Sequence, residues 1–172
     1  MKHIAGLAAL IIMASSADAK PLTGTFPSID GGTLAIEDWR GGPVLVVNTA
    51  SQCAFTKQYD ALQELYDTYA DQGLMVLAVP SDDFRQEFST ADEVKEFCEI
   101  NFNLTLPMTD ITKVRGREAH PFYRRLGEMG FVPRWNFNKV LIGPDGGLVE
   151  TYRSTVKPMS PSITRKIESL LN

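Results

Sequence analysis

Two cysteines, Cys53 and Cys98, are the side chains of this sequence best suited to nucleophilic or redox chemistry. Cys53 lies between a short apolar run, residues 44–47, and a segment of helical spacing that starts after Thr56. A cysteine at a helix N-terminus meets unpaired N–H groups and a partial positive charge, which lower its pKa and favour the reactive thiolate. Cysteine is also commonly buried as a small apolar residue, so position alone leaves both interpretations open.

The residues around Cys53 restrict the kinds of redox and metal chemistry that this cysteine could take part in. The stretch CAFT is similar to the Cys-x-x-Cys redox motif, but Thr56 stands where the second cysteine would be. This replacement argues against ordinary dithiol exchange at that motif. Metal binding is not expected, because the chain has only two histidines, His3 and His120, and His3 falls in the N-terminal leader described next. We predict no cofactor and no metal.

Composition and the N-terminus set the class of protein. The 172 residues are 44% hydrophobic and 22% charged with a net charge of −4, which gives no electrostatic basis for nucleic-acid binding. Residues 1–19 combine a basic start, an apolar core shorter than the roughly 20 residues of a membrane span, and small residues before Lys20. We therefore predict a cleaved signal peptide at 1–19, one domain at 20–172, export to the periplasm or outside the cell, and no membrane association after cleavage.

The apolar patterns predict the elements that would position Cys53. In chain order they are a hairpin around 30–32, a strand at 44–48, a helix over about 56–72, a strand at 73–80, a helix over 90–101, a short helix at 120–126, a hairpin around 144–146 and a helix from 160 onward. A strand, a helix and a strand with short joints form a parallel crossover. The fold class is α/β, with a mixed sheet flanked by helices and an N-terminal β-hairpin.

Longer stretches resemble the glutathione peroxidase family in its cysteine form. They are VNTASQCAFTKQYDALQELY, GLMVLAVPSDDF, EFCEINFNLTLPM, HPFYRRL and WNFNKVLIGPDGGLV, in the family's order. The resemblance implies a thioredoxin-like fold and a peroxidatic Cys53, whose thiolate attacks a hydroperoxide and becomes a sulfenic acid. It also implies that Trp135 and Asn136 contact the sulfur and help to position peroxide. Without the resemblance, we would interpret Trp135 as a core aromatic residue and Asn136 as a turn residue.

One position departs from the family. The family's active-site glutamine falls on Asp83, and Ala54 replaces the family's usual glycine. An ionised carboxylate only accepts hydrogen bonds, and near a thiolate it would repel the charge. The alternative is that Asp82 and Asp83 point to solvent in a loop.

The resemblance also gives Cys98 a role. Family members with two cysteines carry a resolving cysteine in this helix, which closes a disulfide that a thioredoxin-like reductant then opens. The alternative is a buried core cysteine beside Val94. Glutathione is the less favoured reductant, because no cluster of basic residues adjoins Cys53 in the sequence and an exported protein meets little glutathione. The short segment before Trp135 resembles that of monomeric members.

These observations predict an exported, haem-free thiol peroxidase that reduces hydrogen peroxide or organic hydroperoxides. Two alternatives remain open from the sequence. One is a thiol–disulfide protein on the same fold, favoured by Asp83, and the other is a non-catalytic binding protein that has lost peroxidase activity.

Overall fold

The described chain begins with a short hairpin. In a computed structural model, which describes residues 20–171, strands β1 (Thr25–Pro27) and β2 (Thr33–Ala35) pair antiparallel. Gly31 and Gly32 have φ angles of +88° and +75° in the connecting turn, a conformation open to glycine without steric cost. The predicted hairpin is therefore confirmed, while the predicted signal peptide, residues 1–19, lies outside the described residues.

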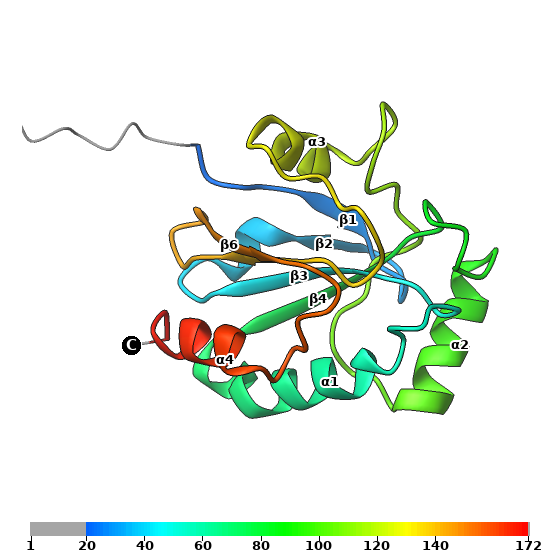
Figure 1. Cartoon of the computed structure of the whole chain (residues 1–172), viewed down its shortest axis with the longest axis horizontal. Helices are drawn as coiled ribbons and strands as arrows, with labels where there is room; N and C mark the ends of the chain where they lie inside the picture. Colours follow the sequence, from blue (N-terminus) through cyan, green and yellow to red (C-terminus); the bar gives the residue numbers. More distant parts are fainter. Residues whose placement is uncertain (1–19, 172) are drawn as a thin grey trace, which may run out of the picture.

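A four-stranded mixed sheet forms the centre of the molecule (Figure 1). Its order is β4 (Met75–Pro80), β3 (Val44–Thr49), β5 (Lys139–Ile142) and β6 (Leu148–Tyr152). Strand β3 runs parallel to β4 and antiparallel to β5, which also pairs antiparallel with β6. All six residues of β3 are buried, which explains the continuous apolar run at its start.

Helices cover both faces of the sheet, as Figure 1 shows. One face carries α1 (Gln58–Tyr69), α2 (Ala91–Phe102), α4 (Pro161–Glu168) and the 3-10 turn η2 (Ala70–Gln72). The other face carries α3 (Pro121–Glu128), the hairpin and the 3-10 turn η1 (Ile36–Trp39). The predicted mixed sheet flanked by helices is confirmed.

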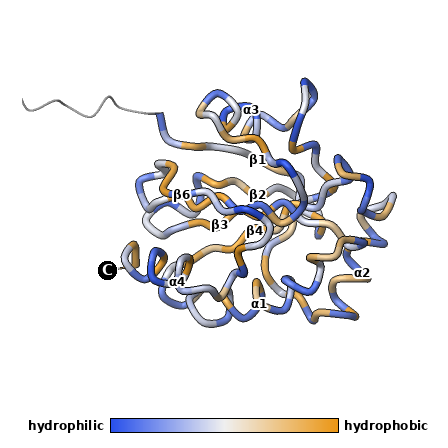
Figure 2. Tube along the Cα trace, viewed as in Figure 1, coloured by the Kyte–Doolittle hydropathy of each residue, from blue (hydrophilic) through white to orange (hydrophobic). Residues whose placement is uncertain are grey.

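Apolar side chains of the sheet face two separate cores. The core under α1, α2 and α4 includes Leu45, Val47, Leu62, Val94 and Ile163. The core under α3 includes Val44, Val46, Leu77, Phe122 and Leu126. Alternate residues of β3 thus point to opposite cores, as the two-residue period of a strand requires. Figure 2 shows the hydrophobic colouring along the central strands.

The predicted helix ends are close to the observed ones, with one difference near Cys53. Helix α1 begins at Gln58 rather than near Thr56, because the residues before it form successive turns. In these turns the N–H of Thr56 donates to the carbonyl of Cys53 and that of Gln58 to Phe55. Helix α2 begins with a capping box, in which the Thr90 and Glu93 side chains each accept from the other residue's backbone N–H group.

Within residues 20–171, no helix is long and apolar enough to cross a membrane. That same stretch holds no group of three or more histidine, cysteine, aspartate or glutamate side chains placed to bind a metal ion.

Candidate active site

Cys53 lies in a tight loop between β3 and α1, and only 9% of its surface is exposed. The Thr56 hydroxyl fixes this loop, since its Oγ1 accepts from the Cys53 N–H at 3.0 Å and donates to the Ala50 carbonyl at 2.8 Å. The threonine that replaces the second cysteine of a Cys-x-x-Cys motif therefore holds the loop closed. The buried strand β3 sets the position of the whole loop.

The Cys53 sulfur receives a backbone donor. The N–H of Phe55 points at Sγ, with a nitrogen-to-sulfur distance of 3.4 Å. A fixed N–H group aimed at sulfur is placed to stabilise negative charge that develops there. The loop ahead of α1 thus supplies the anion-stabilising geometry that the sequence assigned to the helix terminus itself.

The segment from Trp135 to Asn138 folds back beside this loop. The Asn48 side chain donates to the Trp135 carbonyl at 3.0 Å, and the Asn48 carbonyl accepts from the Phe137 N–H at 2.5 Å. Phe137 is a fully buried residue with φ of +61°, a backbone conformation that persists only where the surroundings enforce it. Strand β3 therefore positions both Cys53 and the Trp135 segment.

Trp135 and Asn136 present different surfaces. The Trp135 side chain is 41% exposed and packs on Phe84, with ring centroids 5.4 Å apart, so it is not the core aromatic residue that its type alone suggests. Asn136 is fully buried, and its Nδ2 donates to Gln86 Oε1 at 3.0 Å. Its Oδ1 is buried without a hydrogen-bond partner among the described residues.

Gln86 joins these parts, and sequence reasoning missed it. Its carbonyl accepts from the N–H of Gln52 at 2.9 Å, and its side chain holds Asn136. Gln86 is thus linked both to the residue before Cys53 and to the asparagine. The only signal in the sequence was an amide three residues beyond Asp83, the position on which the family's glutamine falls.

The structure directs the Asp83 carboxylate toward another segment. Its Oδ2 accepts from the backbone N–H groups of Val114 at 2.7 Å and Arg115 at 3.0 Å. Its Oδ1 forms an ion pair with Lys113 at 3.4 Å. The Asp83 side chain anchors residues 113–115 and is neither solvated nor placed by these contacts against the Cys53 sulfur.

Two Asp83 variants separate anchoring from charge repulsion. Asp83→Asn keeps an acceptor for both N–H groups, so we expect its rate constant with hydrogen peroxide to stay within about twofold of wild type. Asp83→Ala removes the acceptor and should lower the free energy of unfolding by about 1–3 kcal/mol. Stopped-flow peroxide reduction and urea unfolding measure the two effects, with the exposed Glu96→Ala as control. A rate increase of tenfold or more in Asp83→Asn would show that the charge acts on the sulfur.

A buried lysine, Lys139, forms hydrogen bonds with elements that adjoin the Trp135 segment. Lys139 Nζ donates to Gln58 Oε1 and to the Val156 carbonyl, both at 2.6 Å. Ser154 Oγ accepts from Asn138 at 2.9 Å and donates to the Asn136 carbonyl at 2.6 Å. These bonds tie the start of α1, the Trp135 segment and the chain after β6 into one unit. Sequence reasoning assigned Lys139 no role.

Burial lowers the pKa of Lys139 to about 7, and this makes stability depend on pH. An unfolded lysine keeps its proton up to a pKa of about 10.4, so unfolding takes up a proton between about pH 7 and pH 10. The stability supplied by Lys139 therefore rises with pH across that window, by up to about 1.4 kcal/mol per unit. Urea unfolding at pH 6 to 10 should show this slope in wild type and lose it in Lys139→Met. Equal slopes in both proteins would contradict the assignment.

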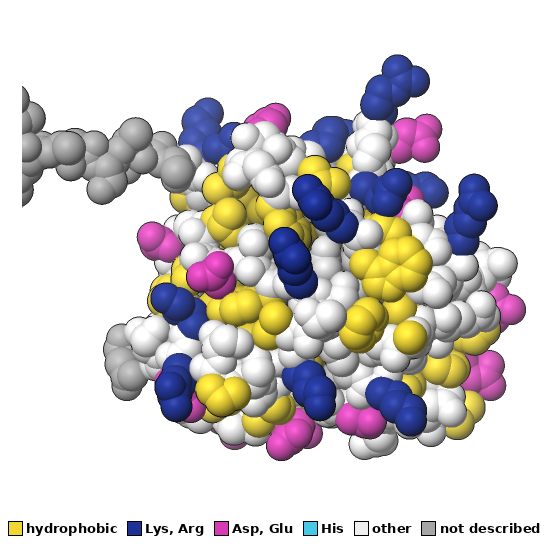
Figure 3. All heavy atoms as spheres, in the orientation of Figure 1, with side chains coloured by type: hydrophobic (Ala, Val, Ile, Leu, Met, Phe, Trp, Pro, Cys, Tyr) yellow, Lys and Arg dark blue, Asp and Glu magenta, His cyan; other side chains and the backbone are white. Residues whose placement is uncertain are grey.

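The fold brings positive charge to the rim of the site. The Arg115 guanidinium lies 5.0 Å from the centre of the Phe84 ring, the ring that packs on Trp135. Figure 3 shows Lys and Arg side chains around hydrophobic surface on one face of the molecule, near α3 and the neighbouring loops. The sequence has no basic cluster next to Cys53, and the fold places the Arg115 guanidinium beside the Phe84–Trp135 pair.

Comparison with known proteins connects this geometry to a family. The sequence model for glutathione peroxidase matches residues 23–127, which include Cys53, Asp83 and Cys98. The chain belongs to the glutathione peroxidase family. A glutathione peroxidase of Lactococcus lactis subsp. cremoris is 40% identical over 136 residues, covering 76% of this chain and 87% of the relative. The family and the activity class predicted from the sequence, a peroxidase, are therefore confirmed.

Other relatives agree with this placement. The hydroperoxy fatty acid reductase gpx1 of Synechocystis is 38% identical over 156 residues, covering 84% of this chain and 91% of the relative. The crystal structure of Trgpx in apo form superimposes with a TM-score of 0.69 at 29% identity, covering 89% and 97% of the two chains. A thioredoxin family protein from Chlorobium tepidum, at 17% identity and a TM-score of 0.66 over 91% and 100% of the chains, shares the fold. The predicted thioredoxin-like fold is confirmed.

Proposed function

We propose that this peroxidase uses Cys53 as its peroxidatic residue. The supporting observation is the single connected unit that surrounds Cys53: the Phe55 N–H on the sulfur, and Gln86 bridging the Cys53 loop to Asn136. The Cys53 thiolate attacks one peroxide oxygen, and the O–O bond breaks as the S–O bond forms. The other oxygen leaves as hydroxide or alkoxide and takes up a proton, while Asn136 and Trp135 position the peroxide. Cys53 is left as a sulfenic acid.

Cys98 is proposed as the resolving residue. Both cysteines are free thiols in this structure. Cys98 attacks the sulfenic sulfur, the S–O bond breaks, and water leaves as the Cys53–Cys98 disulfide forms. Because Cys98 is 1% exposed on α2, this step needs a local opening of the loop or helix. A thioredoxin-like protein then reduces the disulfide, and glutathione is the alternative reductant that the basic rim leaves open.

Hydrogen peroxide and organic hydroperoxides are the proposed substrates. The name of the Synechocystis relative describes a hydroperoxy fatty acid reductase, and the exposed Trp135 ring offers an apolar surface to a substrate with a hydrocarbon chain. The proposal further includes export to the periplasm, based on the composition of residues 1–19, and action as a monomer, based on the short segment before Trp135.

A coupled assay tests the proposed function. The protein is supplied with hydrogen peroxide or a fatty acid hydroperoxide, and NADPH loss is followed with thioredoxin and its reductase or with glutathione and its reductase. We expect sustained turnover with thioredoxin and slower turnover with glutathione. Reduction of insulin disulfides without peroxide consumption would instead support a thiol–disulfide protein.

A further inference from the structure

A buried carboxylate beside the active-site loop takes no part in the steps above. Glu87 is 8% exposed, and its Oε1 accepts from the N–H groups of Ser51 at 3.0 Å and Phe88 at 2.9 Å. Its Oε2 is buried without a hydrogen-bond partner among the described residues. Burial raises the pKa of Glu87, and the Asp82 carboxylate adds to the effect. A buried, unsatisfied carboxylate oxygen costs stability, so its presence points to a use.

Packing places this carboxylate next to the helix of Cys98. Phe88 directly follows Glu87, and Phe97 directly precedes Cys98. The two rings pack edge to face with their centroids 5.4 Å apart. The Ser51 hydroxyl is buried without a hydrogen-bond partner among residues 20–171, and it lies close enough to Glu87 and Cys98 to lower the pKa of both. Ser51 therefore stands between the carboxylate and the thiol, two residues before Cys53 in the chain.

Burial disfavours loss of the Cys98 thiol proton. Burial raises the pKa of this thiol to about 12, so at neutral pH only about one molecule in 10⁵ carries the thiolate. The thiolate is the form that attacks sulfur. Without a base, closure of the disulfide would depend on this very small fraction.

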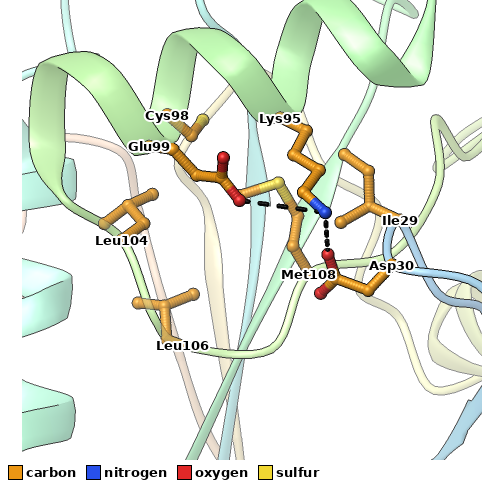
Figure 4. A pocket seen from close by; sticks show the side chains of 8 residues that line it. All are labelled: Ile29, Asp30, Lys95, Cys98, Glu99, Leu104, Leu106 and Met108. Carbon is orange, nitrogen blue, oxygen red and sulfur yellow. Dashed lines mark ion pairs between the residues drawn. The ribbon is translucent and has the colours of Figure 1, made fainter.

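Burial and the carboxylates Glu87 and Glu99 disfavour a Cys98 thiolate. The hydroxyls of Tyr59 and Ser51 face the thiol and lower its pKa, but their effect is smaller than that of burial, and the pKa stays raised. Lys95, which lines the same small pocket, is ion-paired with Asp30 and Glu99, as Figure 4 shows. Transfer of the thiol proton to a carboxylate leaves the total charge of this region unchanged, whereas loss of the proton to solvent would add a negative charge.

We propose that Glu87 is the internal base of the resolving step and accepts the Cys98 proton through the Ser51 hydroxyl, an inference that rests on the proposed function. The Cys98 S–H bond breaks as its proton passes to the Ser51 oxygen, and the Ser51 proton passes to Glu87 Oε2. The Cys98 sulfur bonds to the Cys53 sulfur, and the S–O bond of the sulfenic acid breaks. The departing hydroxide takes the proton from Glu87 and leaves as water, so the carboxylate is restored. The oxidant is the peroxide that formed the sulfenic acid.

Glu87→Gln tests this role, because its amide oxygen can keep the bonds from Ser51 and Phe88 while the base is lost. Sulfenic acid formation and disulfide closure are followed separately by rapid quenching and peptide mass mapping after one equivalent of peroxide. We expect the first step to stay within about twofold of wild type and closure at pH 7 to slow by about 10²-fold. Ser51→Ala should show the same selective loss.

The pH profile distinguishes a base from a structural residue. Wild-type closure should rise through the titration of Glu87 and then level, whereas closure in Glu87→Gln should rise about tenfold per pH unit up to the thiol pKa. The exposed carboxylate variant Glu96→Gln should match wild type. Closure in Glu87→Gln at the wild-type rate, or slowed equally at every pH, would overturn the inference while leaving the proposed function intact. A wild-type protein that forms sulfenic acid but no Cys53–Cys98 disulfide would overturn the resolving role and this inference together.

Discussion

Peroxide consumption is expected to fall by about 10³-fold or more when Cys53 is replaced by serine. The reason is chemical, since a serine hydroxyl stays protonated at neutral pH and cannot form the sulfenic acid that stores the oxidising equivalent. Initial rates of hydrogen peroxide loss with a thioredoxin system measure the effect. The same variant should lose the turnover of organic hydroperoxides, because both substrates are attacked by the one sulfur.

We expect Cys53→Ser to remove the thiol without disturbing the loop that holds it. The bonds that hold the loop involve the Cys53 backbone N–H, Thr56 and Ala50, none of which the substitution removes. Urea unfolding should therefore give a stability within about 1 kcal/mol of wild type. Comparable peroxide rates in the two folded proteins would show that Cys53 is not the peroxidatic residue. Cys98→Ser is the matched control, since it should still consume one equivalent of peroxide.

Much of the fold follows from local patterns in the sequence. The apolar run at 44–47, the turn glycines at 31 and 32 and the Thr90–Glu93 capping box each specify an element through contacts between near neighbours. The order of these elements restricts the sheet to few arrangements, because a strand, helix and strand in succession favour a parallel crossover. The loop at Cys53 was also predictable in position, although its turns delay α1 to Gln58.

Contacts between distant parts of the chain explain what the sequence did not reveal. Gln86 contacts Asn136 across 50 positions, and Lys139 contacts Gln58 across 81. Similarly, the direction of the Asp83 side chain depends on where the fold places residues 113–115. Such pairings depend on how the loops at the ends of the strands converge, which no local pattern encodes. The sequence therefore predicted roles for Cys53 and Asn136 but gave no indication of the Gln86 amide that links their segments.

Replacement of Cys98 by serine is expected to stop repeated turnover with thioredoxin, lowering the steady-state rate by about 10²-fold or more. A sulfenic acid that meets no thiol is driven by further peroxide to sulfinic acid, which thioredoxin does not reduce. In wild type, one equivalent of peroxide without reductant should instead yield a peptide linked through Cys53 and Cys98. Mass mapping of both proteins measures these products directly.

The burial of Cys98 makes this outcome a demanding test. Val94, Phe97 and Cys98 pack against the core on one side of α2, so closure of the disulfide must compete with the packing that holds the helix in place. Two cysteines bond only when their Cα atoms come within about 7 Å, so we expect the loop from Asp82 to Thr90 or the start of α2 to adjust as the disulfide closes. Hydrogen exchange of residues 82–98 should therefore rise in the disulfide form relative to the reduced form. Free Cys98 beside a stable Cys53 sulfenic acid in wild type, with full thioredoxin turnover in Cys98→Ser, would make this a one-cysteine peroxidase.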